Sequence, residues 1–98
     1  NSKKYPVPLI VATIYSFFNK LFIYHSIENK KEASKILGIN PYFIDEYHQA
    51  SSFYPMKRIS KIFEFLLEAD KRSKGIDFDN NDQEGIINDL IFKIFKSN

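Results

Sequence analysis

The chain has 98 residues, no cysteine and a formal net charge of +2, from 14 basic and 12 acidic side chains. This length suits one domain with a core of its own. The lack of cysteine excludes a disulfide framework and thiolate metal sites. The near balance of charge argues against a dedicated nucleic-acid-binding protein, which usually carries a clustered basic excess.

The sequence begins Asn1-Ser2-Lys3-Lys4 rather than with Met, and it shows no secretory signal. We therefore expect a C-terminal fragment of a longer, cytoplasmic protein. The most apolar run, 9–24, is shorter than the roughly 20 residues that span a bilayer, and it contains Asn19 and Lys20. A membrane span is not expected.

The apolar pattern predicts an all-α domain, a compact bundle of about five helices without strands. The first helix, near 8–27, has Pro8 in its first turn, a position that tolerates a missing N–H group. Its apolar arc, centred on Ile14, is broad enough for a central helix with several neighbours. Ile23 falls among the polar side chains of this helix.

Two short helices follow, near 30–37 and 41–52. Asn29 and Asn40 are suited to cap their first turns. Gly38 is suited to end the first in the left-handed conformation, and Pro41 to begin the second. Four residues of the second are expected to face inward: Phe43, Ile44, Tyr47 and Ala50.

Two longer helices complete the predicted fold, near 55–74 and 81–96. The fourth is expected to stop at Gly75. Its predicted core face consists of Ile59, Ile62, Phe63, Leu66, Leu67 and Asp70. The predicted core face of the fifth consists of Ile87, Leu90, Ile91, Ile94 and Phe95.

The stretch from Lys30 to Gln49 has the outline of a helix-turn-helix. If its second helix entered a major groove, Asp45 and Glu46 would face the phosphates, where binding normally depends on Lys and Arg. The preceding helix carries Lys30, Lys31 and Lys35, which favour some backbone affinity. We interpret this corner as structural, and a stand-alone nucleic-acid-binding domain remains the alternative hypothesis.

The alternating Asp77, Asp79 and Asn81 resemble part of a calcium-binding loop. An EF-hand loop also needs Gly at its sixth position and Glu at its twelfth, where this chain has Asp82 and Asn88. Acids at this place instead suit the N-terminus of the fifth helix, because they complement its dipole. We therefore predict no metal site.

Catalytic motifs are equally weak. The two histidines, His25 and His48, are far apart in the sequence, and no Gly-rich phosphate loop or nucleophile elbow is present. Two pairs of carboxylates lie on helix faces that we expect to be solvated: Asp45 with Glu46, and Glu64 with Glu68. We expect a non-enzymatic domain without a cofactor or small-molecule substrate.

Several large apolar side chains fall outside the predicted core faces. Phe65 lies about 120° from the centre of the fourth helix's core face, and Ile23 and Phe92 are similarly placed on their own helices. With Tyr15 and Phe22 on a flank of the first helix, they are candidates for a protein–protein interface. The opposing interpretation, that the helices cover them all, stays open.

One family resemblance covers most of the chain. The stretch SKILGINPYFIDEYHQASSFYPMKRISKIFEFLLEADKRSKG, at 34–75, resembles the C-terminal domain of the delta subunit of the bacterial DNA polymerase III clamp loader. The pattern LG-[IV]-x-P-[FY] at 37–42 and Ala50 before a serine-rich turn carry the resemblance. It also depends on an ending formed by Leu66, Leu67, Asp70, Lys74 and Gly75. FFNKL at 17–21 looks like the family's opening helix.

The resemblance implies a five-helix collar domain that packs beside equivalent domains of the other clamp-loader subunits in a ring. It implies an oligomerisation role in DNA replication, without ATP hydrolysis. Five residues that match the motif then have structural roles: Gly38, Pro41, Asp70, Lys74 and Gly75. Asp70 and Lys74, one turn apart, are expected to form an intrahelical pair.

A DNA contact by this domain is not expected, because the loop at 75–82 is strongly acidic. If the domain has a weak DNA contact, Lys57, Arg58 and Lys61 are the best candidates. A helical partner-binding domain unrelated to replication is a third possibility.

Overall fold

The structure is a computed structural model, and it describes residues 6–75 and 80–98. This part of the chain contains five α-helices and no strand, so the predicted all-α bundle is confirmed. The helices are α1 (Val7–Ser26), α2 (Ala33–Leu37), α3 (Ile44–Phe53), α4 (Met56–Gly75) and α5 (Asn80–Lys96). Short 3₁₀ turns at Lys30–Glu32 and Pro41–Phe43 lead into α2 and α3, so the second and third predicted helices each begin as a tighter turn.

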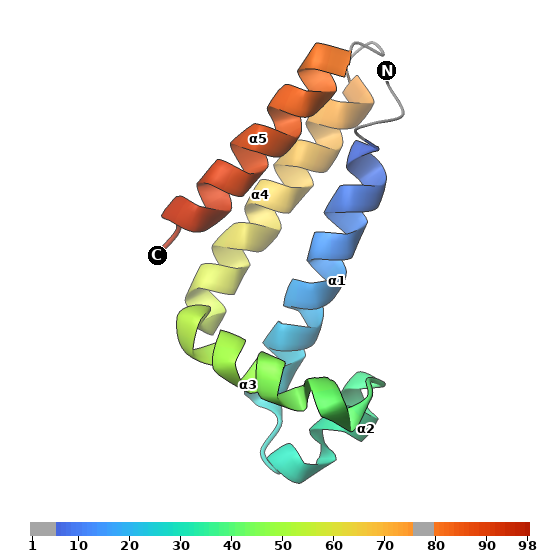
Figure 1. The fold of residues 1–98 in the computed structure, drawn as a ribbon. Coiled ribbons are helices and arrows are strands. Elements are labelled where there is room, and N and C mark those ends of the chain that lie inside the picture. Colours follow the sequence, from blue (N-terminus) through green and yellow to red (C-terminus); the bar gives the residue numbers. More distant parts are fainter. Residues whose placement is uncertain (1–5, 76–79) are drawn as a thin grey trace.

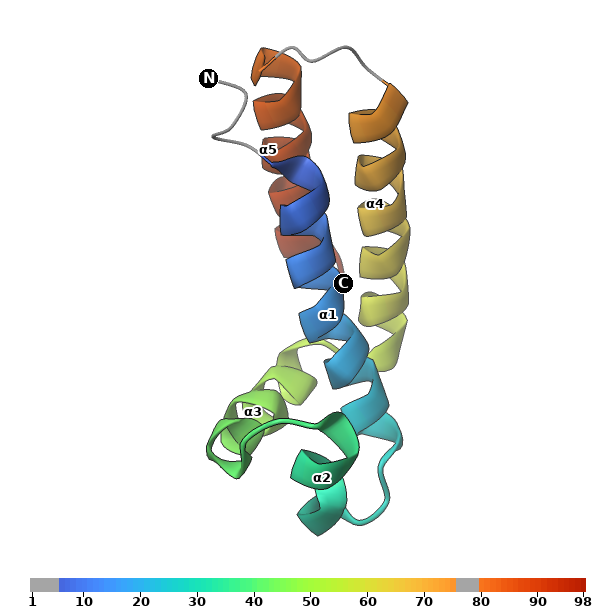
Figure 2. The same cartoon turned by 90° about the vertical axis from the view of Figure 1, so that its right-hand side faces the viewer.

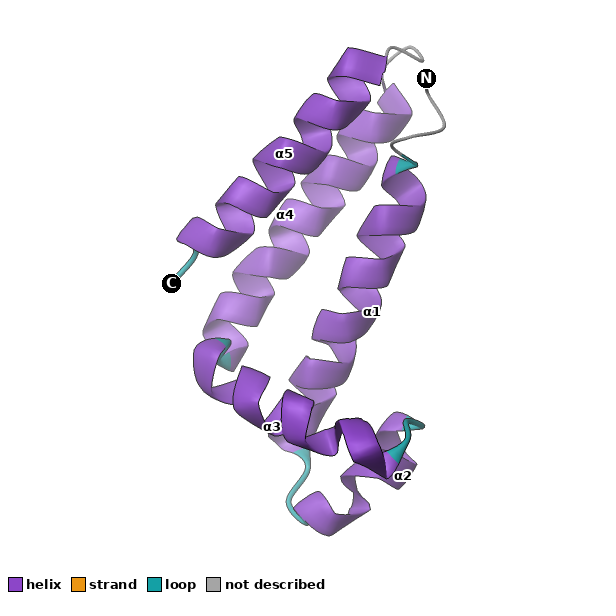
Figure 3. Ribbon diagram, in the orientation of Figure 1, coloured by secondary structure: helices purple, strands orange, loops and turns teal. Residues whose placement is uncertain are grey.

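Three long helices form the body of the molecule (Figures 1 and 3). α4 lies beside both α1 and α5 and runs antiparallel to them, whereas α1 and α5 contact each other only weakly. α2 and α3 form a small lobe at the end of the bundle where α1 ends and α4 begins. The architecture is therefore a three-helix body with a two-helix lobe.

The core of the body is aliphatic. Leu21 of α1, Ile59 and Ile62 of α4, and Ile86 and Leu90 of α5 are almost completely buried. Burial of each such side chain contributes about 1.5–3 kcal/mol relative to an exposed one. These contacts hold the three long helices together.

A second apolar cluster joins the lobe to the end of α1. It consists of Tyr24, Ile27, Ala33 and Leu37. Asn29 Oδ1 accepts a hydrogen bond from the Lys31 N–H group at 3.1 Å, and Asn40 Oδ1 accepts one from the Tyr42 N–H group at 2.8 Å. Gly38 has a φ of 69°, so the turn predicted there is present.

The predicted core faces were wrong at several positions. Leu67 and Phe95 are well exposed, Ile91 and Phe43 are also exposed, and Ala69 is buried on α4 in place of Leu67. The physical reason on α5 is that this helix packs on α4 and touches α1 only weakly. Its buried arc is therefore narrower than its apolar arc.

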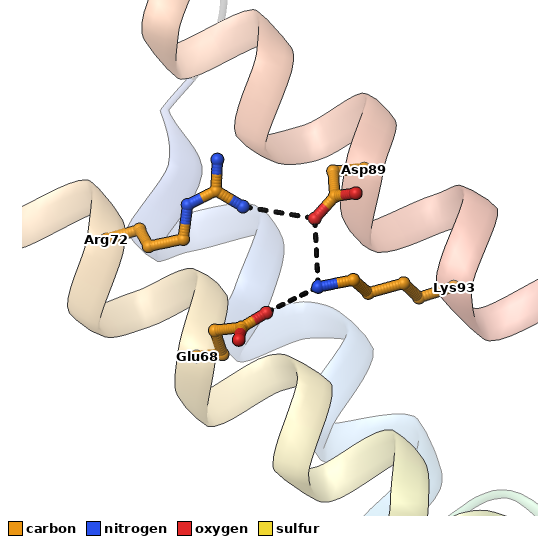
Figure 4. A network of polar contacts seen from close by, with 4 residues as sticks. All are labelled: Glu68, Arg72, Asp89 and Lys93. Carbon is orange, nitrogen blue, oxygen red and sulfur yellow. Dashed lines mark hydrogen bonds and ion pairs between the residues drawn. The ribbon is translucent and has the colours of Figure 1, made fainter.

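Charged side chains connect the outer surfaces of α4 and α5 (Figure 4). Arg72 Nη1 lies 3.0 Å from Asp89 Oδ2, which lies 3.1 Å from Lys93 Nζ, and Lys93 Nζ also pairs with Glu68 Oε1. The hydrogen bond from Lys93 is the main reason that the pKa of Asp89 is lowered. The hydrogen bond to Glu68 is the main reason that the pKa of Lys93 is raised.

Candidate interaction surfaces

The outer face of α5 exposes three large apolar side chains. Ile91, Phe92 and Phe95 are 41, 62 and 73% exposed. At about 100° per residue, they share an arc of about 100° on the helix. Contiguous exposed apolar patches on soluble proteins mark interaction sites, whereas scattered single residues need no explanation. We call these three residues the α5 face.

A shallow pocket lies beside the α5 face. It has a volume of about 330 Å³ and is lined by Lys61, Phe65, Phe92, Lys93, Lys96, Ser97 and Asn98. Phe65 packs partly against the core, and Lys93 Nζ lies 5.9 Å from its ring centre. The prediction that Phe65 is surplus to the core was therefore wrong in part, because α5 packs along that side of α4.

The remaining predicted interface candidates lie on α1. Ile23 and Tyr15 are exposed, in keeping with the prediction. Phe22 is half-buried and its ring centre lies 5.7 Å from that of Phe63, so this side chain belongs mainly to the packing between α1 and α4. Phe22 is thus a weaker interface candidate than the sequence indicated.

An apolar groove runs between α1 and α4. It has a volume of about 260 Å³ and is lined by Pro8, Val11, Ala12, Tyr15, Phe63, Leu66, Leu67 and Asp70. Figure 2 looks onto α1 and α4, and α5 passes behind α1 in this view. The α1/α4 groove and the α5 face have no residue in common.

The two histidines have structural contacts in the lobe. His25 Nε2 lies 2.8 Å from the Tyr54 carbonyl oxygen, to which it donates, and His48 Nδ1 lies 2.9 Å from the Tyr24 hydroxyl. Burial raises the pKa of Tyr24, and the Asp45 carboxylate raises it further. Tyr24 therefore stays protonated across the physiological pH range and serves as a hydrogen-bonding group.

The corner between α2 and α3 does not present a simple basic surface. Lys30 Nζ donates to the carbonyl oxygens of Tyr24 and Ile27, so this cation is engaged at the end of α1. Asp45 and Glu46 are exposed in the first turn of α3. Backbone phosphates approaching this turn would meet two carboxylates.

Two of the residues considered for a weak DNA contact have structural partners. Arg58 donates to Ser97 Oγ, to the Phe53 carbonyl and to the Ile94 carbonyl, and Lys61 Nζ lies 3.2 Å from the Asn98 carbonyl. Lys57 is exposed. Arg58 thus joins helices and is the least available of the three candidates for a DNA contact.

The motif residues from the family resemblance are distributed over the fold. Asp70 Oδ2 lies 2.9 Å from Lys74 Nζ, which is the expected intrahelical pair. Pro41 begins the turn before α3, and α4 ends at Gly75. Most of the calcium-like loop, including Asp77 and Asp79, lies outside the described residues. Within 6–75 and 80–98, no group of three or more His, Asp or Glu side chains is arranged to hold a metal ion.

α1 is long and apolar enough to cross a membrane by length and composition alone. Its most apolar 18-residue window is 28% buried within the protein. A core helix of a soluble protein and a signal sequence meet the same criteria, so this property by itself is weak support for a membrane span.

Sequence reasoning missed three exposed apolar residues that now define surfaces: Ile91 and Phe95 of the α5 face, and Leu67 in the groove. All three flank a core-facing stripe, so periodicity alone assigns them to the core. The available signal was the excess width of those stripes, because a helix buries only the part of a wide apolar arc that its neighbours cover.

Comparisons with known proteins give no relative of this chain. No protein-family model matches the sequence. No curated protein and no solved structure matches it significantly.

Proposed function

We propose that this chain is a non-catalytic assembly domain that binds other protein subunits through exposed apolar helix surfaces. The observation that carries the proposal is the α5 face, where Ile91, Phe92 and Phe95 lie together on the outside of the bundle. Full burial of such a side chain contributes about 1.5–3 kcal/mol. In protein interfaces a few clustered side chains carry most of the binding energy, and the α5 face is a cluster of this size.

Within this class, we propose a collar domain of a delta-type subunit of the DNA polymerase III clamp loader. The support is the sequence resemblance at 34–75, together with the presence of surfaces suited to neighbouring subunits. The domain would hold its subunit in the loader ring during DNA replication in the cytoplasm. The proposal gives this domain no active site, cofactor or small-molecule substrate of its own.

The nucleic-acid-binding alternative is less well supported by the geometry. Lys30 is engaged by the end of α1, and the adjacent turn exposes Asp45 and Glu46. This corner places two carboxylates near the exposed Lys31 and Lys35, which weakens its attraction for phosphates.

The test is co-purification of the chain with the ATPase-type clamp-loader subunits of the same cell. We expect the wild-type chain to bind and the Phe92→Glu/Phe95→Glu double variant to bind at least about tenfold more weakly. Gln49→Glu is the control, which adds one negative charge, half of that in the double variant, to an exposed position of α3. Failure of the wild type to bind rejects the loader as partner, and equal binding by the double variant rejects the α5 face.

A further inference from the structure

We propose that the α5 face binds an acidic, amphipathic segment of a partner protein. The segment's apolar side chains cover Phe92 and Phe95, and its carboxylates pair with Lys61 and Lys96 beside them. The inference rests on the proposed function, in which another protein covers the α5 face, and it adds the chemistry of that partner.

The first support is the charge of the pocket beside the α5 face. Three lysines line it, Lys61, Lys93 and Lys96, and none of its lining residues in the described part of the chain is an Asp or Glu. Lys93 is already neutralised, because Glu68 and Asp89 both pair with it (Figure 4). Lys61 of α4 and Lys96 of α5 therefore remain as the cations that a partner can pair with.

Lys61 and Lys96 have no carboxylate partner among residues 6–75 and 80–98. Lys61 Nζ lies 3.2 Å from the Asn98 carbonyl oxygen, and Lys96 Nζ lies 5.9 Å from the centre of the Phe92 ring. Both lysines are exposed. They can therefore pair with carboxylates of another protein without breaking an ion pair within this part of the chain.

The apolar and the cationic parts of this surface adjoin. Phe92 belongs to the α5 face and also lines the pocket, together with Phe65 and the two lysines. A protein that covers Phe92 therefore also removes water from Lys61 and Lys96. An ammonium group that loses water without a partner destabilises the complex, whereas a carboxylate beside it offsets part of this cost. The geometry thus favours a partner with carboxylates around its apolar side chains.

Acidic side chains further along the same surface favour a protein segment over a nucleic acid or an anionic bilayer. Glu84 is exposed and, at about 100° per residue, lies on the arc between Ile91 and Phe95, about 10 Å from Ile91 toward the start of α5. Glu64 is exposed about one turn after Lys61. A nucleic acid or an anionic bilayer carries negative charge all along its surface and would meet these two carboxylates. A protein segment can place its carboxylates at the lysines alone.

The experiment is fluorescence anisotropy with two labelled peptides of about 18 residues, titrated with the 98-residue chain. One peptide has Leu and Phe along one helical face and Glu elsewhere, and in the other Gln replaces every Glu. At about 50 mM salt, we expect the chain to bind the Glu peptide at least about tenfold more tightly than the Gln peptide.

A double variant tests the two lysines directly. Lys61→Gln/Lys96→Gln should weaken binding of the Glu peptide at least about fivefold and leave binding of the Gln peptide unchanged, because each exposed ion pair contributes modestly. The matched control is Lys31→Gln/Lys35→Gln, which removes the same charge from exposed positions in and just before α2 and should change neither affinity. Gln is a good helix former, so circular dichroism should show unchanged helicity in both variants.

Equal affinities for the two peptides, both lost in Phe92→Ala/Phe95→Ala, would overturn the acidic partner but keep the α5 face as a protein-binding surface. Binding of neither peptide, or binding of the Glu peptide that Lys61→Gln/Lys96→Gln leaves unchanged, would also overturn the inference. Tighter binding of single-stranded oligothymidylate or of phosphatidylglycerol vesicles than of the Glu peptide would assign the lysines to phosphates instead. Failure of the proposed function itself is read separately, from co-purification with the clamp-loader subunits.

Discussion

The Arg58 guanidinium lies over the Tyr54 ring, with 4.5 Å between its Cζ atom and the ring centre. From this position Nε donates to Ser97 Oγ at 2.9 Å, Nη1 to the Phe53 carbonyl at 2.8 Å and Nη2 to the Ile94 carbonyl at 3.1 Å. One side chain therefore joins the end of α3, the start of α4 and the end of α5. Its role is structural, although the sequence made it a candidate for DNA contact.

Arg58→Ala should lower the free energy of unfolding by about 2–3 kcal/mol, because hydrogen bonds to a charged group contribute about 1.5–3 kcal/mol. Urea denaturation measures this change. Lys57→Ala, one residue away and exposed, should change stability by less than about 0.5 kcal/mol. Equal effects of the two substitutions would contradict the structural role of Arg58.

The ion-pair network between α4 and α5 predicts a defined pH dependence. The pKa of Asp89 is lower in the folded state. Its contribution to the free energy of unfolding is therefore fully present above the ordinary carboxyl pKa and is lost as pH falls through the folded-state pKa. The pKa of Lys93 is higher in the folded state. Its contribution to the free energy of unfolding is therefore fully present below the ordinary lysine pKa and is lost as pH rises through the folded-state pKa.

Asp89→Asn should therefore lower the unfolding free energy by about 0.5–1 kcal/mol at about pH 7, the range for partly exposed pairs. The difference between variant and wild type should shrink below about pH 4 and at high salt. Urea titrations across this pH range measure it. If the difference in unfolding free energy between variant and wild type stays constant down to the lowest pH of the titration, Asp89 acts through packing rather than charge.

Lys30 should stabilise the lobe more than its neighbour Lys31 does. Its Nζ donates to the Ile27 carbonyl at 2.7 Å and lies 4.4 Å from the Tyr24 ring centre, at the C-terminal end of α1. Lys30→Ala should cost about 1 kcal/mol through lost helix-end and cation–π contacts. Thermal unfolding of Lys30→Ala and Lys31→Ala side by side is the measurement, and equal melting temperatures would refute the assignment.

Nucleic-acid binding should be absent at the α2–α3 corner. We expect no change in fluorescence anisotropy when the chain is added to labelled duplex or primed DNA at about 50 mM salt. Binding that falls steeply with salt and disappears in the Lys31→Glu/Lys35→Glu variant would instead establish the corner as a DNA-binding site.

Local sequence signals predicted most of the fold. Gly38 was predicted to end a helix, and Asn29 and Asn40 to cap one; these roles depend only on the neighbouring backbone. The structure shows the turn at Gly38 and the hydrogen bonds that the Asn29 and Asn40 side chains accept. The periodicity of α1, α4 and α5 is long enough to identify each helix without knowledge of its neighbours. Helix class and order were therefore predictable.

The surfaces were less predictable, because exposure at the edge of an apolar arc depends on which helices are neighbours. Phe95 looked like a core residue, but α5 has only one main neighbour and leaves it exposed. Phe65 was predicted to lie outside the core, but it is partly buried because α5 packs along its side of α4. The four partners of Arg58 could not be predicted, since they lie in α3, in the turn before α4, in α5 and just after the end of α5.

In the proposed function, another protein covers the α5 face in an assembly. Hydroxyl-radical footprinting read by mass spectrometry measures this directly, in the free chain and in the assembly purified with it. We predict that Phe92 and Phe95 become strongly protected in the assembly, while Tyr42, 80% exposed in the lobe, stays reactive as an internal reference. If Phe92 and Phe95 are as reactive in the assembly as in the free chain, no other protein covers the α5 face.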